Sequence, residues 1–143
     1  GKFVSIVGGD LSSIKAAVDR GAMVAEDALI DSFVIGNLGE KVFEAMCGVV
    51  DVKEKKALGV VETFTAATAI LAADAAVKAA VVQLVEVRIA RGMGGKCFVT
   101  MTGNVADVRA AVESGAAIAE REGVLINKEV IANPHPELWQ AIM

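Results

Sequence analysis

Residue types that commonly build catalytic or metal sites are scarce in this chain. Its 143 residues include one histidine, two cysteines and no tyrosine, and 4% of the residues are aromatic. The cysteines, Cys47 and Cys97, are far apart and form no Cys-x-x-Cys pair, the spacing typical of zinc and redox sites. We therefore expect two free thiols, no metal ligand set in the residues present, and no enzyme, since no motif combines a nucleophile, a base and an orienting group.

Charge of one sign is also lacking. The net charge is -4 with a pI near 5.0, and the densest basic run, Lys53–Lys56, is short. Such a chain lacks the cationic patch that neutralises phosphates, which argues against nucleic acid. The apolar stretch Thr63–Val85 contains Asp74 and Lys78 near its middle, and each charge would cost about 2.5 to 3.5 kcal/mol at a bilayer centre. We expect neither a nucleic-acid partner nor a membrane span.

Apolar residues, in contrast, are abundant at 55%. This share exceeds the roughly 45 to 50% of ordinary globular domains, so one small core does not hide all of it. We expect part of the apolar surface to lie in subunit contacts. The wealth of alanine favours helices that approach a sheet closely.

The chain also repeats itself. Residues 95–120 align without gaps on residues 1–26 with ten identities in 26 positions, where roughly two or three are expected by chance. After a two-residue shift the match resumes, with Leu29 on Leu125 and Phe43 on Trp139.

The block 57–94 precedes the second copy but has no counterpart before the first. A complete tandem would need a matching block of about 38 residues ahead of Gly1. We therefore expect residues 1–47 to be the C-terminal half of one domain, 48–56 a linker and 57–143 a complete second domain. The first half-domain was cut away, or another chain or segment supplies it.

Hydrophobic periodicity and turn signals predict the secondary structure of both copies. For the first copy they predict strands at Lys2–Val7 and Leu29–Ile35, a helix capped by Asp10 between them, and a short helix at Lys41–Met46. For the second they predict strands at Ala57–Glu62, Val82–Ala90, Phe98–Thr102 and Leu125–Ile131, helices at Phe64–Ala80 and after Asn104, and a last short helix through Trp139. This order is typical of an α+β, ferredoxin-like (split βαβ) fold.

Several of these segments carry a family resemblance. ALGVVET at 57–63, AADAAVKAA at 72–80, the turn RGMGG at 91–95 and PHPELW at 134–139 together resemble the shell-protein domain of bacterial microcompartments. The repeat makes the chain similar to the tandem-domain, trimer-forming branch of that family, and most of all to the branch found in propanediol-utilisation compartments.

The resemblance implies a structural protein of the microcompartment shell, located in the cytoplasm. Three chains would form a six-lobed homotrimeric tile that packs against other shell proteins and has a central pore for metabolites or electrons. Arg91, Gly92, Met93, Gly94 and Gly95 match the family's pore-lining turn. In relatives the first-domain turn can carry a cysteine, three of which hold a [4Fe-4S] cluster. That turn would precede Gly1, so no residue present is assigned as its ligand, and Cys97 lies on the strand beyond the turn.

The resemblance also places contacts at the tile edge. Lys78 matches the family's edge lysine, which packs against the neighbouring tile, and Asn133 and His135 match further residues of the tile-edge contact. Asn133 replaces an arginine, and Val81 replaces an asparagine found in many relatives. Both departures put strong contact between tiles in doubt.

Other interpretations stay open for the same residues. RGMGG also fits an ordinary hairpin turn, and it is no phosphate cradle because Ala90 and Cys97 break the GxxxxGK[ST] pattern. Lys78 also fits a snorkelling lysine, and His135 fits a turn residue. The alternative function is a trimeric ferredoxin-like regulator that binds a small effector between subunits.

Overall fold

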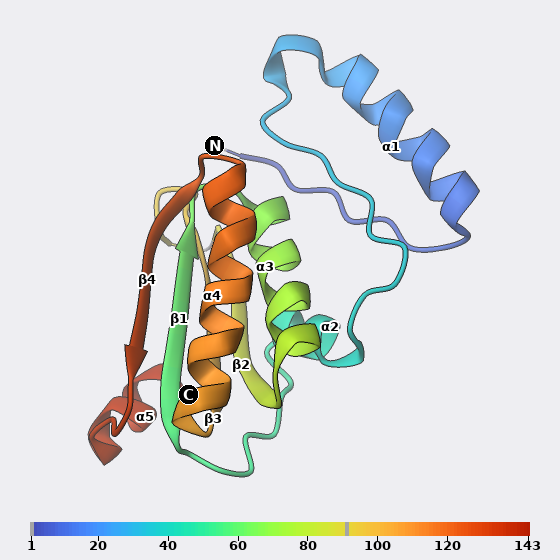
Figure 1. Ribbon diagram of the computed structural model, residues 1–143. Coiled ribbons are helices and arrows are strands. Elements are labelled where there is room, and N and C mark those ends of the chain that lie inside the picture. The colour runs from blue at the N-terminus through green and yellow to red at the C-terminus, as the bar shows by residue number, and fades with distance from the viewer. Residues whose placement is uncertain (1, 91) are drawn as a thin grey trace.

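The second repeat forms one antiparallel sheet covered by helices. The computed structural model describes residues 2–90 and 92–143. The strands lie in the order β2-β3-β1-β4 (Figure 1). Their bounds are β1 Ala57–Thr63, β2 Val82–Ile89, β3 Cys97–Gly103 and β4 Leu125–Ile131. This element order and sheet order confirm the predicted α+β, split βαβ fold.

Two alanine-rich helices, α3 (Ala66–Ala79) and α4 (Val105–Arg121), cover one face of the sheet. They cross closely at Gly115, where an added Cβ would lie 2.8 Å from the carbonyl oxygen of Ala72. Small residues therefore set the spacing between the two helices. The core between helices and sheet contains Leu84, Val87, Val99, Met101, Val108 and Val112.

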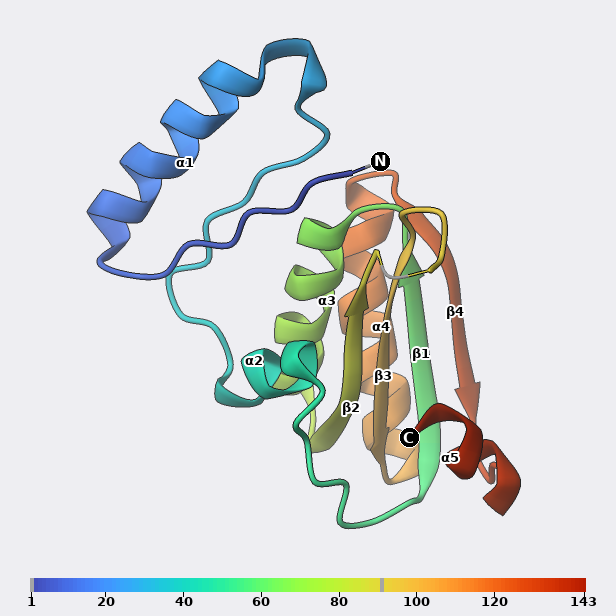
Figure 2. The ribbon, with the colours of Figure 1, turned by 180° about the vertical axis from the view of Figure 1, so that it is seen from behind.

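The last helix, α5 (Pro136–Ile142), lies on the other face of the sheet (Figure 2). Its Trp139 is 3% exposed and packs with Leu58 and Val85. The predicted short helix after Pro136 is thus confirmed, and it attaches through one large aromatic side chain.

The first repeat contains α1 (Leu11–Ala25), the 3-10 turn η1 (Glu26–Ala28) and α2 (Glu40–Cys47), but no strand in its described part. Asp10 caps α1 as predicted, since its carboxylate accepts from the Ser13 backbone N–H at 3.0 Å. The hydrogen bond from the Ser12 hydroxyl makes the largest contribution to lowering the pKa of Asp10, and the bond from the Ser13 N–H makes the next largest. Together they hold this pKa well below its usual range. Figures 1 and 2 both show α1 standing apart from the sheet and its helices.

The predicted strands Lys2–Val7 and Leu29–Ile35 are wrong for this structure. Their counterparts β3 and β4 each pair with β1 and not with each other. Residues 2–47 contain no counterpart of β1, so the two segments have no central strand here with which to exchange hydrogen bonds. A strand without a partner leaves its backbone groups to water and is not stable alone.

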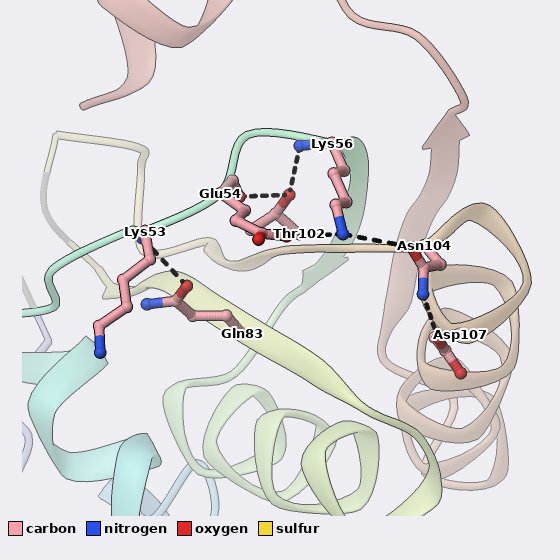
Figure 3. A network of polar contacts seen from close by, with 7 residues as sticks. All are labelled: Lys53, Glu54, Lys56, Gln83, Thr102, Asn104 and Asp107. Carbon is pink, nitrogen blue, oxygen red and sulfur yellow. Dashed lines mark hydrogen bonds and ion pairs between the residues drawn. The ribbon is translucent and has the colours of Figure 1, made fainter.

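Residues 48–56, predicted as a linker, contain no helix or strand but are fastened to the second repeat (Figure 3). The Lys53 N–H donates to Gln83 Oε1 at 3.3 Å, and the Lys56 N–H donates to Thr102 Oγ1 at 3.1 Å. Lys56 also reaches Asn104, which begins α4 without a side-chain cap of its own. The connection between the repeats is therefore held against the second domain.

Candidate functional site

The glycine-rich turn between β2 and β3 is the first candidate. Arg91, predicted to line a pore, lies outside the described residues, and the structure places Gly92 to Gly95 beyond the end of β2. Gly92 and Gly94 have φ values of 67° and 63°. Residues that carry a side chain rarely adopt this backbone conformation, so glycine suits the turn whatever its function. Met93 is half-buried, and its carbonyl accepts from the Lys96 N–H at 3.2 Å.

The start of the first repeat reaches the same turn. Lys2 Nζ donates to the Gly95 carbonyl oxygen at 3.2 Å. A Cβ at Gly95 would lie 2.6 Å from Lys2 Nζ, the mobile end of a long side chain, so the positive φ of 85° restricts this position more than the contact does. Both repeats therefore contribute to the surroundings of the turn.

Lys78, predicted as a tile-edge residue, lies at the end of α3 and binds the first repeat. Its ammonium group donates to the Asn37 carbonyl oxygen and to Asp74 Oδ2, each at 2.6 Å. The other oxygen of Asp74 accepts from the Gly39 N–H at 2.8 Å. Lys78 and Asp74, four residues apart on one helix, together hold residues 37–39.

The segment that leads to this contact also touches the beginning of α3. The Thr65 hydroxyl, at the N-cap of α3, donates to Asp31 Oδ2 at 2.6 Å, and the Thr68 hydroxyl lies 3.4 Å from the same oxygen. The first repeat thus binds both ends of α3. Sequence reasoning missed Asp31, and only the Asp74-Lys78 spacing on one helix could have indicated the other contact.

Asn133 and His135, predicted at the tile edge, lie in the loop between β4 and α5. Both side chains border an open hollow of about 640 Å³. Its other lining residues are Lys55, Pro134, Pro136, Trp139 and Gln140. The His135 side chain is exposed, and its Nδ1 accepts from the Glu137 N–H at 3.3 Å, which is the behaviour of a residue that begins a helix.

The strand register shows how the candidates are arranged. The turn lies where Cys97 pairs with Thr63, and Asn133 follows the opposite end, where Ile131 pairs with Leu58. Lys78 lies close to the start of β2, at the same end as Asn133. However, β2 and β4 are the two edges of the sheet, so Lys78 and the Asn133 loop occupy opposite edges of one domain.

The two cysteines lie in different surroundings. Cys97 is buried in the core, and burial raises the pKa of its thiol above the ordinary value. Cys47 is exposed at the end of α2. Within residues 2–90 and 92–143 no three His, Cys, Asp or Glu side chains gather where a metal ion would fit.

The two acids within apolar segments both have structural partners. Asp74 binds Lys78 and the Gly39 N–H, and Glu62 lies 3.6 Å from Lys96 Nζ. Neither is paired with a second carboxylate or a histidine in the described contacts. Each acid therefore has a cationic partner, Lys78 for Asp74 and Lys96 for Glu62. No helix that the structure describes is both long and apolar enough to cross a membrane.

A split βαβ sheet with two alanine-rich helices on one face assigns the domain to the ferredoxin-like α+β class. The BMC domain family model matches residues 57–134, which cover the second repeat from β1 to the loop before α5. The chain therefore belongs to the BMC domain family of bacterial microcompartment shell proteins.

Individual relatives agree with this assignment. The chain is 40% identical to the bacterial microcompartment shell protein PduT of Citrobacter freundii over 143 residues, 100% of this chain and 78% of that protein. It is 45% identical over 83 residues to the bacterial microcompartment shell protein EutM of Salmonella typhimurium, covering 58% of this chain and 84% of EutM.

A solved structure is also similar. A microcompartment protein from Desulfitobacterium hafniense DCB matches this chain with a TM-score of 0.83 and 40% sequence identity. The match covers 92% of this chain and 73% of the chain of that protein. The likeness extends beyond the second repeat, because residues 57–143 alone would cover much less of the chain.

Proposed function

We propose that this protein is a structural component of a bacterial microcompartment shell, within the cytoplasm, and that three copies form a six-lobed tile. Its family and the shell-protein names of its relatives support the structural role. The contact between the repeats supports the trimer. In it the end of the first repeat binds the β2 edge of the second domain through Lys78 and Asp74. Two domains joined by this contact lie side by side in the same orientation.

Such a contact propagates around a ring. The end of the first repeat leaves its own repeat and docks on the next domain, and the end of the second repeat, at the β4 edge, is its sequence counterpart. If the exposed side of each domain's C-terminal segment also binds the β2 edge of a neighbour, the contact is heterologous and closes only when the ring is complete. Two domains per chain and six lobes require three chains.

The proposal includes a complete first domain. The first repeat has the counterparts of β3, α4, β4 and α5, and it lacks those of β1, α3 and β2. We propose that a strand-helix-strand block supplies them, with its first strand inserted between Lys2–Val7 and Leu29–Ile35. The similarity to PduT leaves part of that relative unmatched, so relatives of this kind have room for such a block.

The pore of the tile belongs to the turn after β2. A Cβ at Gly92 or Gly94 would meet nothing within 4 Å, and Met93 is the one large side chain among Gly92 to Gly95. Three such turns on a threefold axis would form an opening for small metabolites. The edge contacts with neighbouring tiles are proposed for Asn133 and His135, because both are exposed.

A native mass spectrum tests the tile, and electron microscopy of overexpressing cells tests the shell role. We expect a trimer, with or without a bound fragment that completes the first domain, and sheets or tubes in the cells. Monomers under gentle ionisation would overturn the trimer. Discrete particles that bind a nucleotide would favour the regulator in place of the shell protein.

A further inference from the structure

The chain carries two C-terminal segments of the same origin. The first tail is Asn37–Gly39 with α2, and the second tail is Asn133–His135 with α5; the repeat aligns them position by position. They differ in what they bind. The first tail packs on the other repeat, with Val42 and Ala45 fully buried, whereas Ala141, the counterpart of Ala45, is exposed.

The surface that receives the first tail is compact and polar at its rim. We call it the docking edge: Asp74, Val77 and Lys78 of α3, beside β2. Asp74 and Lys78 bind the backbone of Gly39 and Asn37, not their side chains. Backbone groups are present in any tail, so these two bonds alone do not distinguish one tail from the other.

Val77 does distinguish them. A Cβ at Gly39 would lie 2.9 Å from Val77 Cγ2, a distance that real Cβ atoms essentially never show. A valine in a helix strongly prefers one χ1 rotamer, so its methyl group does not simply turn away. The second tail has His135 at the place of Gly39, and its Cβ and imidazole would occupy the volume of the Val77 methyl group.

We propose that the docking edge is a selective binding surface that accepts the first tail and rejects the second, with Gly39 and Val77 as the residues that decide. The partner is thus a shell-domain tail with glycine at its third position. In the proposed tile, on which this consequence rests, the second domain meets only first-repeat tails. The edge that receives the second tail in a neighbouring copy must then carry a side chain smaller than valine at the place of Val77.

The decisive substitution is Gly39→Ser in the whole chain. Gly39 is the N-cap of α2, and it has φ -57° and ψ 133°, which any residue adopts. Serine is a better N-cap than glycine, so helix capping alone predicts that the amides of α2 are better protected from hydrogen exchange. A clash with Val77 predicts that they are less protected. Hydrogen exchange followed by mass spectrometry over residues 37–47 reads the difference directly.

We expect Gly39→Ser and Gly39→His to lower the protection of α2 about ten- to hundredfold, the cost of overpacking. Adding Val77→Ala to Gly39→Ser should restore most of the loss, while Val77→Ala alone should change it little. The matched control is Gly36→Ser, since a Cβ there meets only Leu11 at an ordinary 3.7 Å. Exchange in α4 reports whether the second domain stays folded.

Two results would overturn the selectivity: wild-type protection of α2 in Gly39→Ser, or a double variant no better protected than Gly39→Ser. If α4 loses protection as well, the comparison of single and double variants still decides, because only a clash with Val77 is relieved by Val77→Ala. Native mass spectra of the same samples report the trimer separately, so failure of the tile and failure of the selectivity are distinct results.

Discussion

The two repeats share a sequence pattern and have different structures. In α4 the residues Val108, Ala111, Val112, Gly115, Ala116 and Ala119 are buried. Their counterparts in α1 are Ile14, Ala17, Val18, Gly21, Ala22 and Ala25, and no residue of α1 is buried. An amphipathic pattern therefore predicts a helix in both places, but its apolar face is covered only where the β1 and α3 elements exist to cover it.

The strands show the same dependence more sharply than the helices. A helix satisfies its backbone hydrogen bonds within itself, so α1 forms without neighbours. A strand depends on a neighbouring strand for its backbone hydrogen bonds. Both Lys2–Val7 and Leu29–Ile35 need a counterpart of β1 as that neighbour. The difference between the repeats is thus a measure of what β1 contributes as the central strand.

The largest expected effect contrasts Trp139 with Phe43, its counterpart. Trp139 is 3% exposed and Phe43 is 59% exposed, since Phe43 has no sheet of its own repeat to cover. Trp139→Ala should lower the free energy of unfolding by about 3 to 5 kcal/mol, and Phe43→Ala should change it by less than about 0.5 kcal/mol. Chemical denaturation measures both, and equal losses would show that Phe43 is buried in solution.

Next comes the pair Gly115 and Gly21. Gly115→Ala should destabilise the second domain by about 1 to 3 kcal/mol, because its Cβ would collide with the backbone of Ala72. Gly21 has open space around it, so Gly21→Ala should stabilise α1 by about 0.5 to 1 kcal/mol through helix propensity alone.

Unfolding curves for Gly115→Ala and the helical circular dichroism of Gly21→Ala measure this pair. In a completed first domain the sign at Gly21 should reverse, because a counterpart of α3 would cross there. Stabilisation in the 143-residue chain and destabilisation in the completed protein would together support the proposed block.

A smaller effect is expected at the contact between repeats. Lys78→Met removes the donor to the Asn37 carbonyl and leaves the mostly buried Asp74 carboxylate without its cation, which should cost about 1 to 2 kcal/mol. The Lys78 side chain is about half exposed, which limits the loss. Faster hydrogen exchange over residues 37–47 would show it, and Lys15→Met on α1 is the matched control that should leave this segment unchanged.

The smallest effect is expected at Asp31, which accepts from the Thr65 hydroxyl at the start of α3. Asp31→Ala should cost about 1 kcal/mol, the usual worth of such a hydrogen bond, and should loosen residues 29–35. Its repeat counterpart, Asn127, bonds mainly to the neighbouring Lys128 N–H, so Asn127→Ala serves as the control. Exchange in residues 29–35 that is unaffected by Asp31→Ala would contradict a role for this contact.

Much of the second domain could be predicted from its residues. Period and caps located the strands and helices to within a few positions, because each element is locally consistent with its surroundings. The same rules failed for the strands of the first repeat, since pairing is not a local property. The candidate site was predictable only in part: the glycine turn and the His135 loop carry visible patterns, whereas the contact of Lys78 with a carbonyl oxygen involves a backbone group that has no sequence signature.

By itself, the sequence determined the repeat, the helices with their caps, the alanine-rich packing and membership of the shell-domain family, because these depend on neighbouring residues or on similarity along the chain. Only the tertiary structure decided that residues 2–47 form no sheet, that the tail of the first repeat binds the β2 edge of the second domain, and that Gly39 faces Val77. These features depend on distances between residues remote in sequence, where one methyl group or one absent strand determines the result.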